Sequence, residues 1–317
     1  MYDNSPVPES PEDLRRFIND ELEKIRDALS ELEDDVGTDF YLEVARGAKK
    51  GYSIVNKFGH SDAISTTLVP ICSGNVYQTP TTAQSLELVS TASTDNQAGV
   101  GARTLTIQGL DANFNEVTVV ANMHATDGTI AEAVTGTWIR IYRMYVETSG
   151  TYASQIAGSH VGTVTLQTVG GGAGTGWAVL ELHGGFPAGQ SNIGVYTVPA
   201  GKTGYIGNVE IETDTNKAMD ILFFQRQGAD DVTVPYKAMR NVGAYTGISD
   251  RHVGRAKMLD GPFPEKTDIG FMAQRTSAGT SSTSINSGFI AATCIATSRA
   301  TSFSPPSSST STPIRPP

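Results

Sequence analysis

Cysteine is nearly missing from this sequence. Only Cys72 and Cys294 occur in 317 residues, and they lie far apart. Two isolated thiols cannot build a disulfide framework, and a zinc site needs more Cys or His ligands at close spacing. Both cysteines stand in apolar, strand-like sequence, so we expect buried free thiols, with a bridge between the two as the alternative.

Long apolar runs are missing as well. No segment approaches the roughly 20 apolar residues that a membrane-spanning helix needs. Residues 1–6 contain no basic residue and no apolar core follows them, so we expect no secretion signal. These absences predict a protein that is synthesised in the cytoplasm, remains soluble and does not insert into a membrane.

Positive charge is scarce and the acidic excess is unevenly placed. The net charge is −10, and residues 1–46 alone hold 14 acidic and 5 basic side chains. The other 19 acidic and 18 basic residues nearly cancel, and they form no basic patch. Nucleic-acid binding is therefore not expected, and the acidity belongs to an N-terminal element.

This N-terminal element has the signature of an amphipathic helix. Ser10 suits the N-cap and Pro11 the first helical position, while Gly37 suits the C-cap. A heptad seam follows at spacings of 4, 3, 4 and 3, made of Ile18, Leu22, Ile25, Leu29 and Leu32. Leucine at one core position and mainly isoleucine at the other favours bundles of more than two strands.

Two interpretations of the helix remain open. It could pack on its own β body, or it could be an anchor that docks on a larger assembly or bundles with other copies. We favour the anchor, because charge and position set the helix apart from the rest of the chain. The candidate assembly residues are Leu14, Phe17, Ile18, Leu22, Ile25, Leu29 and Leu32.

After the helix, the apolar pattern changes to a period of two, which is typical of strands. Residues 103–108 and 116–123 predict a hairpin, and residues 195–206 predict a strand, a tight Pro-Ala-Gly turn and a second strand. The fold class that follows is mainly β, with two tandem β-sandwich or jelly-roll-like units preceded by one N-terminal amphipathic helix.

Composition also predicts where the units end. The glycine run 170–176 marks a boundary, and residues 298–317 hold ten Ser or Thr and five Pro, too polar for a core. The predicted divisions are 1–37 for the extended lead and anchor helix, 38–60 for a linker, 61–170 and 171–297 for the two β units, and 298–317 for a C-terminal arm.

The residues that usually carry chemistry show no strong arrangement. No HExxH, paired-cysteine or GxSxG pattern occurs, although a Ser-His-Asp triad built by the fold stays open. Asp111, Asn113 and Asn115 resemble a calcium loop but lack its sixth-position glycine and final glutamate. We expect no catalytic, cofactor or metal site. The histidines are His60, His124, His160, His183 and His252.

Residues 11–25, Pro-Glu-Asp-Leu-Arg-Arg-Phe-Ile-Asn-Asp-Glu-Leu-Glu-Lys-Ile, resemble the short N-terminal anchor helix of structural proteins from short-tailed bacteriophages. The body resembles β-sandwich virion proteins of such phages. The segments that carry this likeness are 75–80, 109–116, 195–205, 223–227 and 261–271.

The resemblance implies a virion protein without enzymatic activity, most simply a tail fibre or tail-associated appendage that contributes to host attachment. Its implied partners are a tail adaptor or nozzle, or the major capsid protein, further copies of itself as a homotrimer, and a host surface glycan. A capsid decoration (cement) protein is the alternative, because a long fibre shaft is missing. The third function considered is that of a polysaccharide-degrading enzyme, for which Glu181, Glu210 and Glu212 are candidate carboxylates.

Overall fold

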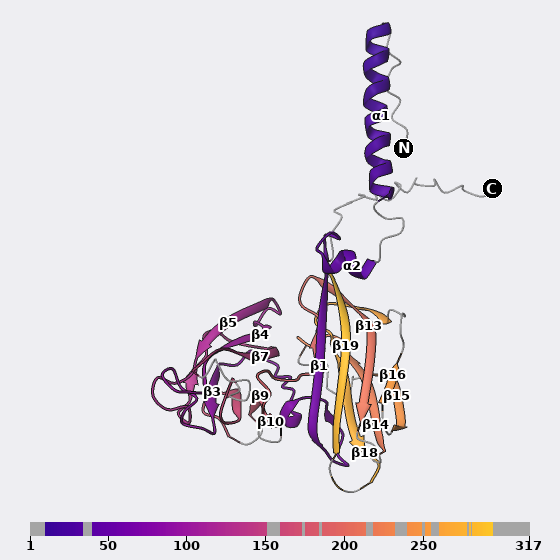
Figure 1. The fold of residues 1–317 in the computed structure, drawn as a ribbon. Helices are drawn as coiled ribbons and strands as arrows, with labels where there is room; N and C mark the ends of the chain where they lie inside the picture. Colours follow the sequence, from indigo (N-terminus) through magenta and orange to yellow (C-terminus); the bar gives the residue numbers. More distant parts are fainter. Residues whose placement is uncertain are drawn as a thin grey trace, which may run out of the picture.

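The computed structural model describes residues 10–33, 40–150, 159–172, 175–183, 186–213, 218–231, 240–248, 251–254, 260–277, 279 and 281–293. The fold is mainly β, as predicted, with one long N-terminal helix and several antiparallel sheets (Figure 1). The helical elements are α1 (Pro11–Glu33), α2 (Phe40–Ala45) and the single 3-10 turn η1 (Ser73–Asn75).

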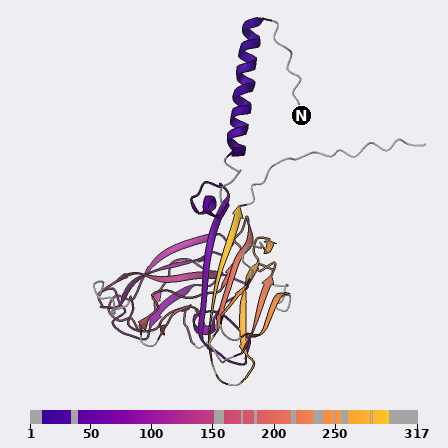
Figure 2. The ribbon, with the colours of Figure 1, turned by 45° about the vertical axis from the view of Figure 1, so that its right-hand side comes forward.

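Helix α1 begins where the capping pattern places it. The amide of Leu14 donates to the carbonyl of Ser10 at 3.0 Å, so Ser10 precedes the first helical turn. Charged pairs at i, i+3 spacing run along the helix, with Lys24 and Glu21 2.7 Å apart. Figures 1 and 2 both show α1 apart from the sheets. The predicted C-cap, Gly37, lies outside the described residues.

Two sheets form what we call the outer sandwich. The first has the order β1 (Tyr52–Ile64), β19 (Ser281–Thr293), β13 (Lys202–Thr213) and β16 (Arg251–Gly254), with β17 (Asp260–Phe263) also on β13. The second has the order β12 (Val195–Thr197), β18 (Asp268–Arg275), β14 (Met219–Arg226) and β15 (Arg240–Ile248), with β2 (Val69–Pro70) on β18. Buried apolar side chains from both sheets share one core, among them Ile206, Ile211, Ile221, Phe223 and Phe271.

The chain between β2 and β12 forms what we call the inserted sandwich. One sheet has the order β6 (Glu132–Ala133), β3 (Leu86–Ser90), β8 (Val164–Thr168) and β9 (Gly176–Leu180). The other has the order β5 (Glu116–Asn122), β4 (Ala102–Leu110) and β7 (Arg140–Ser149). A short pair, β10 (Leu182–His183) and β11 (Phe186–Pro187), follows. A second core includes Leu86, Leu105, Ile107, Trp138 and Leu166.

The strand pairing divides the chain differently from the predicted ranges. The predicted linker 38–60 holds α2 and most of β1, and β1 pairs with β19 over a register that runs from Tyr52 opposite Ala292 to Ile64 opposite Ser281. The first and last strands of the body are therefore neighbours in one sheet. A sequence read in order could not show this, because the pairing joins segments more than 200 residues apart.

The predicted boundary at 170/171 is also wrong. Strands β8 and β9 pair with each other across the glycine run, with Val164 opposite Leu180. The two strands on either side of the run therefore belong to one sheet, and no boundary between units falls between them. The predicted C-terminal arm, residues 298–317, lies outside the described residues.

The predicted hairpin and the predicted strand, turn and strand of residues 195–206 are both confirmed. Strands β4 and β5 pair as expected, with Leu110 opposite Glu116 across the polar loop. Strands β12 and β13 flank the Pro-Ala-Gly turn but pair with different partners, β18 and β19. That turn carries the chain from one sheet of the outer sandwich to the other.

Candidate functional site

The candidate assembly residues of α1 lie on the surface of the chain. The exposed fractions of Ile18, Leu22 and Ile25 are 46%, 56% and 52%. Leu14 and Phe17, beside them near the start of the helix, are 42% and 40% exposed. Leu29 and Leu32 belong to α1, but their side chains lie outside the described part of the chain. The five described apolar side chains are thus not buried against the chain's own sheets.

A second apolar group lies where the helices lead into the body. Phe40 and Leu42 of α2 are 37% and 45% exposed, and Tyr52 at the start of β1 is 44% exposed. The rings of Phe40 and Tyr52 meet edge to face with their centroids 5.4 Å apart. The exposed apolar surface therefore occurs on both helices and at the start of the first strand.

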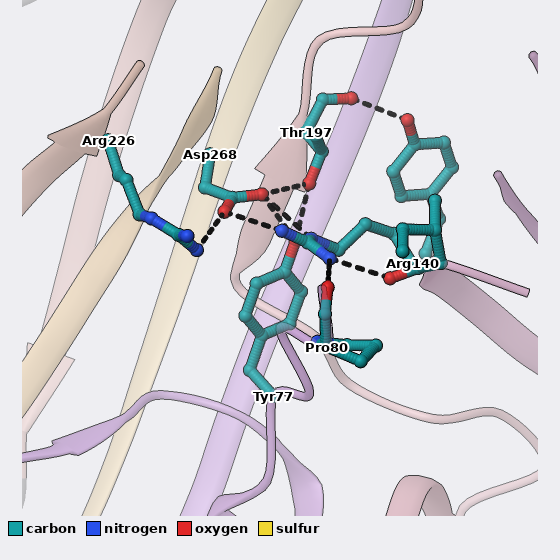
Figure 3. Close-up of polar contacts among 8 residues, drawn as sticks. Tyr77, Pro80, Arg140, Thr197, Arg226 and Asp268 are labelled. Carbon is teal, nitrogen blue, oxygen red and sulfur yellow. Dashed lines mark hydrogen bonds and ion pairs between the residues drawn. The ribbon is translucent and has the colours of Figure 1, made fainter. Parts of the chain in front are cut away.

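A buried polar network joins the two sandwiches (Figure 3). The Asp268 carboxylate of β18 accepts hydrogen bonds from Arg140 Nε and Nη2 of β7, both at 2.9 Å. Thr197 Oγ1 donates to the same carboxylate at 2.6 Å, and Arg226 Nη1 lies 3.4 Å from it. Tyr77 OH lies within 2.6 Å of Thr197 Oγ1.

This network has the character of a structural tie rather than of a reaction centre. Arg140 and Asp268 are 0% and 1% exposed, so no solute reaches them in this conformation. Burial opposes the charged form of Arg140, but the Asp268 carboxylate outweighs it and raises the pKa of the guanidinium above its ordinary value. Burial, followed by the Asp268 charge, raises the pKa of Tyr77, which stays protonated.

A cleft of about 500 Å³ opens between the two sandwiches. Strand β1 of the outer sandwich forms one wall, and β4, β5 and β7 of the inserted sandwich contribute the rest, with Tyr196 from β12. The polar side chains that line it are Asn56, Lys57, Gln108, Glu116, Thr118 and Arg143. No local sequence pattern predicts this cleft, because its walls come from strands that are brought together only by long-range contacts.

The residues considered for metal binding and catalysis are not gathered into one site. Among the described residues, no group of three or more His, Cys, Asp or Glu side chains is placed to hold a metal ion. His160 is buried, with Nδ1 2.7 Å from the carbonyl oxygen of Gly162. Within the same part of the chain, no helix has the length and apolar character needed to cross a membrane.

The carboxylates named for glycoside hydrolysis lie in different sheets. Glu181 follows β9 and its Oε1 accepts a hydrogen bond from the amide of Gly74 at 2.7 Å. Glu210 and Glu212 lie on β13 of the outer sandwich. The two groups are therefore held by separate sandwiches.

The loop that resembles a calcium site uses its carboxylate internally. Asp111 Oδ1 accepts hydrogen bonds from the amides of Asn113 and Asn115 at 2.8 and 2.9 Å. Although desolvation acts to raise it, these amides hold the pKa of Asp111 below its ordinary value. The loop is thus a closed hairpin turn, as the sequence predicted. Cys72 is a buried free thiol, as predicted, whereas Cys294 lies outside the described residues.

Comparison with known proteins identifies no family. No family model matches the chain, and no curated protein matches it. Among solved structures, the infectious bursal disease virus Gt strain superposes with a TM-score of 0.22 at 10% identity, covering 81% of this chain and 78% of the other. The structure of the Gx strain of that virus superposes with a TM-score of 0.23 at 10% identity, covering 77% of this chain and 73% of the other. These scores are too low to establish a common fold.

Proposed function

We propose that this chain is a structural component of a bacteriophage particle, a tail fibre or tail-associated appendage that α1 attaches to the tail and that contributes to host attachment. The observation that carries the proposal is the exposed apolar stripe of α1, formed by Leu14, Phe17, Ile18, Leu22 and Ile25. Contiguous exposed apolar surface on a folded protein marks an interaction site. The likeness of residues 11–25 to phage anchor helices supplies the kind of partner.

The stripe also supports self-association. Leu22 and Leu29 fall at one core position of the heptad, and Ile18, Ile25 and Leu32 fall at the other, an arrangement that favours three or four strands. We therefore propose a parallel homotrimer held partly by the α1 helices. Each Leu or Ile that is buried in the seam contributes about 1.5–3 kcal/mol to the free energy of association. A two-heptad helix is too short to hold a trimer on this contribution alone, so contacts between the β bodies must add to it.

Charges beside the seam favour the parallel, in-register arrangement. Glu21 and Arg26 are five residues apart, and they flank the core positions on opposite sides. In parallel bundles, these two flanking positions of neighbouring helices face each other, so Glu21 of one copy meets Arg26 of the next. Within one chain Arg26 is exposed and Glu21 is partly exposed, with Glu21 near Lys24 and Arg26 near Glu23.

Part of the exposed apolar stripe of α1 lies outside the heptad core positions and is available to contact the phage particle. Leu14 and Phe17 lie outside the core positions of the heptad and near the start of α1, and both are exposed. We assign them to contact with the virion partner, a tail adaptor or nozzle. Three copies present this contact three times, and such multivalency makes weak single contacts collectively strong.

A capsid decoration protein is the second candidate. The observation in its favour is that the described chain has one 23-residue helix leading to two sandwiches, without a long coiled-coil or repetitive shaft. In this case the partner of α1 would be the major capsid protein. A polysaccharide-degrading enzyme ranks below both, because its candidate carboxylates are held by separate sandwiches.

Immunogold electron microscopy of intact particles, with antibody raised against residues 60–297, tests the proposal. Label at a single vertex around the tail is the expected result. Label spread evenly over the head would replace the tail assignment with the decoration protein. Particles without label, from a lysate that contains the protein, would refute a virion role.

A further inference from the structure

The cleft between the two sandwiches carries two cationic side chains side by side. Lys57 of β1 is 3% exposed, and its Nζ donates to the carbonyl oxygen of Tyr142 at 2.5 Å. Arg143 of β7 lies on the same cleft and donates from Nη2 to the carbonyl oxygen of Asn56 at 2.9 Å. Burial, followed by the like charge of Arg143, lowers the pKa of Lys57 to about 7.

Neither cation has a carboxylate partner within the part of the chain that the structure describes. Glu116 is the one acidic residue among those that line the cleft, and it forms an ion pair with Lys202. Strand β19, which pairs with β1 opposite Lys57, contains no Asp or Glu. Buried cations are normally paired with an anion, because desolvation of an unpaired charge is costly.

We propose that this cleft binds an acidic sugar, whose carboxylate pairs with Arg143 in front of the buried positive charge of Lys57, and whose hydroxyls meet Asn56, Gln108 and Thr118. Its volume of about 500 Å³ lies within the usual range of small-molecule sites and is far larger than a single oxyanion needs. Amide and hydroxyl side chains both donate and accept, as sugar hydroxyls require. Arg143 offers the planar fork of donors that suits a carboxylate.

As a route to host attachment, this site rests on the proposed function, since a surface polysaccharide would supply the sugar. The binding itself is a property of the purified chain and is tested without particles. Absence of binding would therefore remove the site and leave the virion assignment untouched, whereas a failed particle-labelling experiment would leave the site standing.

Binding is expected to weaken as the pH rises past neutrality. The groups around Lys57 other than Arg143 keep their charge state in this range: burial raises the pKa of Cys72 to about 12 and that of Tyr142 and Tyr196 well above 10. Glu116 is held by Lys202. A bound carboxylate raises the pKa of Lys57, so the loss of sugar binding should occur somewhat above pH 7.

The test is calorimetric titration of the full-length protein with sodium glucuronate, glucose and sodium sulfate between about pH 6 and about pH 8.5. We expect saturable binding of glucuronate, and at least tenfold weaker binding of glucose and of sulfate, the order expected for one charge-assisted contact. Arg143→Gln and Lys57→Met should each weaken glucuronate binding at least about tenfold. Arg103→Gln, which changes an arginine outside the cleft, is the matched control and should bind normally.

Three results would overturn the proposal. One is no saturable glucuronate binding by the folded wild-type protein. Another is sulfate binding as tight as glucuronate binding, which would leave a simple oxyanion site. The third is unchanged binding by Arg143→Gln. Because Lys57 is buried, the circular dichroism of Lys57→Met is compared with that of the wild type to check that the variant folds. If Lys57→Met does not fold, glucuronate binding by Arg143→Gln alone tests the proposal.

Discussion

Arg140 and Asp268 form a buried, two-bond ion pair that joins the inserted sandwich to the outer sandwich. Both nitrogen-to-oxygen distances are 2.9 Å, although the residues are 128 positions apart in the chain. Thr197 adds a third hydrogen bond and Arg226 a second cation to the same carboxylate. Asp268 therefore holds β7, β12, β14 and β18 in one arrangement.

Asp268→Asn should lower the free energy of unfolding by about 3–5 kcal/mol, because it leaves the Arg140 guanidinium buried without its carboxylate partner. Urea denaturation followed by tryptophan fluorescence measures the change. The comparison is Asp230→Asn, which breaks the more exposed pair with Lys266 and should cost about 1 kcal/mol or less. Equal decreases in the free energy of unfolding of the two variants would show that the buried ion pair does not stabilise the chain more than the exposed pair does.

Lys57 makes stability depend on pH. Its pKa is about 7 in the folded chain and ordinarily 10.5, so between these values the unfolded chain binds a proton that the folded chain does not. The free energy of unfolding should therefore rise with pH from about 7 to about 10.5, by up to about 1.4 kcal/mol per pH unit from this group.

The difference in stability between wild type and Lys57→Met, measured by denaturation across this range, isolates the effect. Below pH 7 the penalty of the buried charge is fully present, so the Met variant should gain most there relative to wild type. A difference that does not change with pH would contradict a lowered pKa. Adding a glucuronate ligand should raise the wild-type stability most below pH 7.

Local patterns were enough to predict some elements, and long-range pairing explains the rest. Ser10 and Pro11 mark the start of α1, and alternation marks β4 and β5, because capping and period-two signals lie within a few residues. The pairing of β1 with β19 leaves no local sign. Lys57 shows why the cleft was missed: nothing near it in sequence distinguishes a buried lysine from a solvated one.

Asp95 should be essential to the inserted sandwich. It is fully buried, and its carboxylate accepts hydrogen bonds from Ser90 Oγ and from the amides of Ala102, Val161 and Gly162, at 2.5–2.9 Å. Asp95→Ala leaves these donors unpaired and should cost at least about 3 kcal/mol in urea denaturation. Asp111→Ala, in a solvent-accessible turn, is the control and should cost about 1 kcal/mol. A mild effect at Asp95 would mean that water replaces the carboxylate.

Charge reversal tests the parallel α1 bundle. Glu21→Arg and Arg26→Glu should each weaken self-association a few-fold, since each places like charges opposite one another between neighbouring helices. The double variant restores opposite charges and should recover the wild-type association. Sedimentation equilibrium of the full-length proteins gives the constants. A double variant that associates more weakly than both single variants would rule out the parallel register.

The most direct test of α1 as a separable anchor is co-sedimentation of the protein with particles that lack it, comparing the full chain with a chain that lacks residues 1–36. We expect the full chain to bind, and the shortened chain to stay in the supernatant while keeping its β-sheet circular dichroism and cooperative melting. A shortened chain that still binds, or one that no longer folds, would show that α1 is not a separable anchor.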